Sequence, residues 1–140
     1  MKIAILGIGA VFALILGGVA LGGYAPAYQL SFGTFAIMAL AICGTFFRLY
    51  RSRATPLALG MALSWAGSAG VIGWWYVLSL LDRPEGMVGN SLIFVFLATH
   101  MTGAFLHFRV IGSTLGWVPG LWVLIPVTGF LLTLAATLLV

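Results

Sequence analysis

The sequence predicts an all-α integral membrane protein, a bundle of about five transmembrane helices joined by short loops. Hydrophobic residues make up 63% of the 140-residue chain, charged residues make up only 6%, and the mean hydropathy is +1.22. A water-soluble domain could not cover so much apolar surface. Apolar stretches of about 20 residues, the length that crosses a bilayer, recur five times. No long linker separates them, so residues 1–140 are expected to form a single transmembrane domain.

Five spans and four connections follow from this pattern. The predicted spans are Ile3–Gly23, Leu30–Leu49, Pro56–Leu81, Ser91–Val110 and Leu121–Val140. The connections are rich in Pro, Gly, Ser or charge, as turns are: Tyr24–Gln29, Tyr50–Thr55, Asp82–Asn90 and Ile111–Gly120. The first stretch has an alternative interpretation as a cleaved signal peptide, because Lys2 precedes it and small residues follow it; four spans would then remain. We favour its retention because the stretch is longer than a usual signal core.

The distribution of charge predicts the orientation. Cytoplasmic loops carry an excess of Lys and Arg. The loop after the second span is flanked by three arginines, and the next loop has a net negative charge: Arg48, Arg51 and Arg53 in the first, and Asp82, Arg83 and Glu85 in the second. Counting outward from the arginine loop places the N-terminus, Lys2 and Arg109 on the cytoplasmic side. We therefore predict a multi-pass protein of a bacterial inner membrane, in which the basic residues set the topology and bind no nucleic acid.

A stripe of polar and small residues runs along the second span. Steps of three and four residues put its members on one helix face, which is expected to point into the bundle: Ser31, Thr34, Met38, Ala41, Thr45 and Arg48. Close packing, with hydroxyls bonded to their own helix, is the favoured interpretation. The alternative is a polar path for a solute or ion along Ser31, Thr34, Thr45 and Arg48.

Small residues recur at similar spacing in other spans and favour close helix packing. The groups are Gly18 with Gly22, Gly60 with Ser64 and Ser68, and Gly129 with Thr133 and Thr137. Pro126 is expected to kink the fifth span one turn before it.

The two histidines of the chain lie in the fourth span. His100 is near its centre, and His107 follows two turns later on the same face, with Gly103 and Ala104 between them. Ionisable residues at that depth are rare and usually functional. We expect His100 to hydrogen-bond a hydroxyl or carbonyl on a neighbouring helix, and His107 to lie at the cytoplasmic interface.

A cofactor site is the alternative interpretation of His100 and His107. An imidazole is a good axial ligand for haem b or another metal, and a quinone or proton site would use the same group. Two histidines about 10 Å apart on one helix cannot ligate one iron from opposite faces. The second ligand would come from Met38, Met61 or a partner subunit.

Few residues could support catalysis. The only acidic side chains, Asp82 and Glu85, lie together in one loop, so we do not expect catalytic carboxylates. A dyad of Ser68 and His100 is the one alternative that the spans offer. The lone cysteine, Cys43, excludes an intrachain disulfide and a thiolate metal cluster.

Three functions remain, in this order. The first is a small non-catalytic subunit or anchor of a larger membrane complex, for which electron transfer with a haem or quinone near His100 is one option. Its partners would be the bilayer, other membrane subunits or further copies of the chain. The second is a small oligomeric transporter or channel with a path along the His100 face and the stripe of the second span. The third is an intramembrane enzyme acting on a lipid-soluble substrate.

Overall fold

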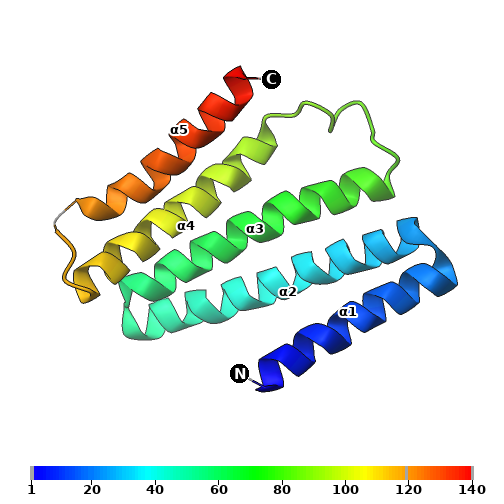
Figure 1. Ribbon diagram of the computed structural model, residues 1–140, viewed down its shortest axis with the longest axis horizontal. Coiled ribbons are helices and arrows are strands. Elements are labelled where there is room, and N and C mark those ends of the chain that lie inside the picture. The colour runs from blue at the N-terminus through cyan, green and yellow to red at the C-terminus, as the bar shows by residue number, and fades with distance from the viewer. Residues whose placement is uncertain (1, 119, 140) are drawn as a thin grey trace.

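A computed structural model describes residues 2–118 and 120–139. Each helix runs antiparallel to the one before it (Figure 1), and no strand occurs in these two ranges. The helices are α1 Lys2–Gly22, α2 Tyr24–Arg53, α3 Pro56–Leu80, α4 Leu92–Thr114 and α5 Leu124–Leu138, with a 3₁₀ turn at Leu121–Val123 before α5. Five helical segments are long and apolar enough to cross a membrane. The predicted all-α class and the five apolar segments are therefore confirmed.

The second helix begins six residues earlier than predicted. Residues 24–29, expected to form a connection, are helical, and the turn is reduced to Gly23 at φ 87°. Glycine adopts this left-handed conformation without a steric penalty. Pro26 does not break α2, because it lies in the first turn, where a backbone N–H has no partner within the helix.

The connection between α2 and α3 is also shorter than expected. Ala54 adopts the left-handed conformation at φ 48°, and its N–H donates to the carbonyl of Tyr50 at 2.7 Å. Thr55 is extended, as the residue before a proline tends to be. Pro56 then opens α3 at its first position, where proline is favoured.

The last two helices depart from their predicted bounds as well. α4 continues to Thr114, four residues beyond the predicted end. Left-handed glycines, Gly116 and Gly120, shape the connection that follows. The distortion expected one turn before Pro126 is present as the 3₁₀ turn Leu121–Val123, after which α5 is regular.

α3 lies between α2 and α4 and packs against both (Figure 1). The buried residues of these helices are mostly alanine and glycine. Ala36 and Ala39 of α2 are buried, as are Ala58, Ala62 and Ala69 of α3. Aromatic rings cover the same interface: Phe35 lies 6.3 Å from Trp65 between ring centroids, and Tyr76 packs over Gly33.

The backbones of α3 and α4 come very close together. A Cβ atom added to Gly67 would overlap the backbone N of His100, and one added to Gly103 would overlap the backbone N of Ser64. Gly60 faces Gly103 and His107 in the same interface. Only residues without a side chain allow two helix backbones to approach this closely. The predicted packing role of Gly60 and Ser64 is therefore confirmed.

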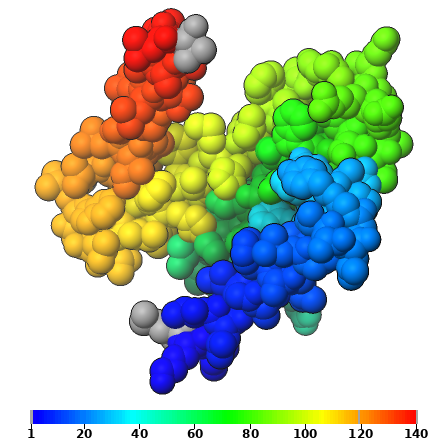
Figure 2. All heavy atoms as spheres, turned by 45° about the vertical axis from the view of Figure 1, so that its right-hand side comes forward, coloured from blue at the N-terminus to red at the C-terminus, as the bar shows by residue number. Residues whose placement is uncertain are grey.

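α1 and α5 flank this three-helix unit and contribute no buried residue. α1 lies close to α2 at the Gly23 turn, where Gly18 packs on Ala27, and diverges from it toward the N-terminus (Figure 1). Gly22, its predicted partner in packing, has open space around it. Figure 2 shows the C-terminal part of α5 projecting away from α3 and α4.

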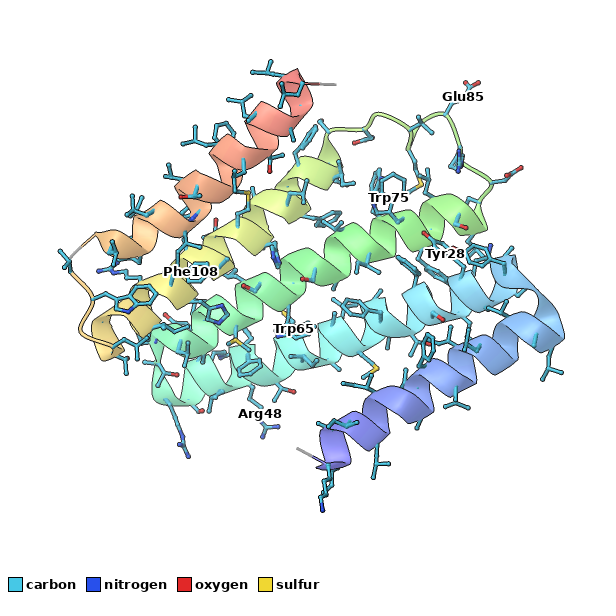
Figure 3. The ribbon with its side chains drawn as sticks, viewed as in Figure 1. Tyr28, Arg48, Trp65, Trp75, Glu85 and Phe108 are labelled. Atoms are coloured by element: carbon cyan, nitrogen blue, oxygen red, sulfur yellow. The ribbon has the colours of Figure 1, made fainter. Side chains whose placement is uncertain are left out.

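The polar stripe of the second span does not point into the bundle. Thr34, Thr45 and Arg48 are exposed, and Ser31 is half-buried, while Arg48 extends away from α3 (Figure 3). The prediction that this face points inward was wrong because the opposite face of α2, with Gly33, Ala36 and Ala39, allows a closer approach to α3. Large and polar side chains are left outside.

The α3–α4 contact can be tested with one methyl group. Gly103→Ala should lower the free energy of unfolding in detergent by about 1–3 kcal/mol, because the new Cβ must displace backbone. Gly44→Ala is the matched control, since a Cβ there meets no atom within 4 Å, and it should be neutral or stabilising. Equal stability of the two variants would contradict the close approach.

Candidate functional site

His100 is held in place by α3. Gly67 allows the His100 backbone to lie against α3. The imidazole Nδ1 is then 2.9 Å from the backbone carbonyl oxygen of Ser64 and 3.0 Å from Ser68 Oγ. The structure therefore contains the hydrogen bond to a neighbouring helix that we expected of His100.

These two contacts determine which ring nitrogen carries the proton. A carbonyl oxygen only accepts hydrogen bonds, so Nδ1 must donate to Ser64 O. Ser68 Oγ, at a similar distance, accepts from the same N–H. In the neutral imidazole, Nε2 is then unprotonated and keeps its lone pair. His100 therefore presents an acceptor, or a metal ligand, on the side of the ring away from Ser64.

The same geometry argues against a Ser68–His100 catalytic dyad. A general base must take the serine proton with an unprotonated ring nitrogen. The nitrogen that faces Ser68 Oγ already carries a proton, which the Ser64 carbonyl holds in place. The two residues are neighbours, as a dyad would require, but in this tautomer Nδ1 cannot accept the proton of Ser68.

A groove of about 440 Å³ lies between α4 and α5, and His100 lines it. Three phenylalanines form much of its wall, among them Phe108, which lies between the two helices in Figure 3. His100 is the only ionisable side chain in the lining. The lining residues are His100, Met101, Ala104, Phe105 and Phe108 from α4, and Pro126, Gly129, Phe130 and Thr133 from α5. The volume is in the range of natural ligand sites.

A second groove, of about 480 Å³, lies on another side of α4. Its polar lining residues are Thr99 and Thr102, whose hydroxyls donate to Val95 O and Ala98 O of their own helix at 2.8 Å. No lining residue is ionisable. Although it is slightly larger, this groove lacks a side chain that could orient a ligand, so the His100 groove is the better candidate.

His107 does not join His100 at the groove. It is half-buried beside Gly60 in the α3–α4 contact, and its Nε2 is buried without a hydrogen-bond partner among the described residues. Both histidines face α3, as their seven-residue spacing predicts, but only His100 lines the space between α4 and α5. The structure therefore separates the two predicted cofactor residues.

The proposed second haem ligands are also elsewhere. Met38 is 59% exposed on the outer face of α2, and Met61 lies on α3; neither lines the groove. Within residues 2–118 and 120–139 no three His, Cys, Asp or Glu side chains come together to hold a metal ion. Cys43 is a half-buried free thiol.

The polar-path residues of α2 lie apart from this groove. Ser31 and Thr45 donate to the carbonyls of Ala27 and Ala41 of their own helix, at 2.7 and 2.9 Å. Such bonds agree with the favoured interpretation of the stripe, in which hydroxyls bond to their own helix.

The contribution of α5 to the groove was not predicted from the sequence. Gly129 and Thr133 were grouped as a packing stripe, but nothing lies within 4 Å of a Cβ placed at Gly129, and both residues line the groove opposite α4. The sequence feature that could have indicated this part of the groove was the fall in side-chain size after Pro126. It indicates a hollow only once α4 is known to lie opposite.

Comparison with known proteins gives no relative for this chain. No family model matches it, and no curated protein or solved structure is similar to it.

The proton on Nδ1 can be observed directly. Nitrogen-15 NMR of the imidazole should show protonated Nδ1 and unprotonated Nε2 at neutral pH. Ser68→Ala should keep this tautomer, because Ser64 O still accepts, and should cost less than about 1 kcal/mol of stability, as single hydrogen bonds between membrane helices do. A spectrum with the proton on Nε2 would contradict the assignment.

Proposed function

We propose that the chain is a multi-pass integral membrane protein with its N-terminus on the cytoplasmic side of a bacterial inner membrane. The alternating helix directions support this orientation (Figure 1). They put five of the six basic residues at one end of the bundle, and the acidic loop with Arg83 at the other: Lys2, Arg48, Arg51, Arg53 and Arg109 at the first, and Asp82 and Glu85 at the second. An excess of basic residues marks the cytoplasmic side.

We further propose that it is a small non-catalytic subunit of a larger electron-transfer complex. The observation that carries the proposal is the isolation of α1 and α5, which contain no buried residue although each segment is long enough to cross a membrane. Helix association in lipid depends on close packing rather than on hydrophobic burial. Most of the packing surface of these two helices is therefore left for other chains.

α1 shows the kind of surface that a partner helix needs. Gly9, Ala13 and Gly17 follow one another at four-residue spacing and share one face of the helix. Ala13 is exposed, and nothing lies within 4 Å of a Cβ placed at either glycine. Small residues at this spacing let a second helix approach closely, and no helix of this chain occupies the position.

The site favours electron transfer over transport or catalysis. The two grooves open at the side of the bundle and are lined mostly by apolar residues. Two of the three hydroxyls of the α2 stripe that would line a path, those of Ser31 and Thr45, are bonded to their own helix. His100, by contrast, offers an unprotonated nitrogen beside aromatic rings, which suits a flat, apolar redox cofactor.

Native mass spectrometry of the protein, extracted gently from the membrane in which it is made, tests the subunit role. Wild-type protein should co-purify with other membrane chains. Gly9→Leu should lose them, because the leucine fills the small-residue face. Gly7→Leu is the control, since two residues along a helix turn it to nearly the opposite face and a Cβ there also meets no atom.

Two outcomes would overturn the proposal. A wild-type chain that purifies alone as a monomer would exclude the subunit role. A homo-oligomer without other chains would favour the transporter alternative instead.

A further inference from the structure

We propose that the groove between α4 and α5 binds haem b, with Nε2 of His100 as an axial ligand of the iron. The inference rests on the proposed electron-transfer function and names the cofactor at its site. It is carried by the hydrogen bond from His100 Nδ1 to Ser64 O and by the lining of the groove.

The hydrogen bond of His100 is the one that metal-bound histidines make. Such a histidine almost always donates its other ring N–H to a carboxylate, a water or a backbone carbonyl, which fixes the tautomer and makes the ligating nitrogen more basic. Here the backbone carbonyl of Ser64 accepts from Nδ1 at 2.9 Å. Coordination would use the Nε2 lone pair, and no proton would have to leave the imidazole.

This tautomer favours haem over a quinone. The carbonyl oxygens of an oxidised quinone need hydrogen-bond donors, but the unprotonated Nε2 of His100 can only accept a hydrogen bond. A quinol could donate to Nε2, yet the contact would be lost on oxidation. A haem iron accepts the same lone pair in its ferric and ferrous states, so one fixed tautomer serves both halves of the redox cycle.

The groove lining suits a flat, apolar macrocycle. Ala104 and Gly129, from opposite walls, leave its middle open, and Gly129 has no neighbour within 4 Å of its Cβ position. Phe105, Phe108 and Phe130 supply rings that can pack against a porphyrin. α5 contains no His, Cys or Met, so the lining side chains with a nitrogen or sulfur atom, His100 and Met101, both come from α4.

The test is a titration of the purified full-length chain in detergent with ferric haem, followed by absorption spectroscopy. Wild-type protein should bind one equivalent with a shifted Soret band. His100→Ala should weaken binding by more than the roughly 10-fold to 100-fold typical of losing a supporting hydrogen bond. Free imidazole should restore the band by replacing the missing ligand.

Matched variants separate coordination from damage to the fold. His107→Ala, on the same helix, should bind haem like the wild type. Gly129→Leu should block binding by filling the groove while His100 is intact, and Gly44→Leu, at an equally open position on α2, should not. Haem uptake that is unchanged in His100→Ala or in Gly129→Leu would overturn the proposal, as would the absence of saturable binding by the wild type.

The titration is independent of the subunit proposal. A chain that binds no haem but co-purifies with other membrane chains would remove the haem and leave the subunit role. A chain that binds haem through His100 but purifies alone would do the reverse.

Discussion

The close approach of α3 and α4 is the constraint on which the rest of the structure depends. Gly67 and Gly103 have no side chain at points where a single Cβ would overlap the backbone of the other helix. Gly60 lies two turns before Gly67 on α3 and also faces α4, so the contact extends over several turns. Because α3 also packs on α2 through alanines, the three middle helices form a unit with almost no large side chain inside it. Large and aromatic residues are displaced to the outside, where they form the walls of the grooves beside α4.

The polar chemistry of His100 follows directly from that contact. A helical carbonyl is normally covered by its own helix and by neighbouring side chains, but a glycine at position 67 lets the imidazole reach Ser64 O from the adjacent helix. That single bond fixes the tautomer, and the tautomer determines what the groove can bind. A residue larger than glycine at position 67 would therefore alter the site by displacing His100, although position 67 itself does not line the groove. The packing of α3 against α4 therefore determines the binding chemistry of His100.

The sequence predicts the apolar segments well and the faces of the helices poorly. Length and hydropathy indicate five helices because crossing a bilayer requires about 20 apolar residues, a requirement independent of packing. The inward face of α2 was predicted from Ser31, Thr34 and Thr45, yet the alanine face packs inward, because such hydroxyls can bond to their own helix and need no partner. The start of α2 was also predicted incorrectly. A proline such as Pro26 is expected to break a helix, but in the first turn it does not. The placement of α5 depends on tertiary contacts that no local pattern encodes.

The hydrogen bonds of the spans distinguish His100 from the polar residues around it. Five hydroxyls donate to carbonyls four residues earlier in their own helices, so each has a hydrogen-bond acceptor without contacting another helix. They belong to Ser31, Thr45, Thr99, Thr102 and Thr133. His100 instead bonds across to α3 with one nitrogen and leaves the other beside an apolar groove. An imidazole held in one tautomer next to space for a ligand is harder to explain by packing than by binding.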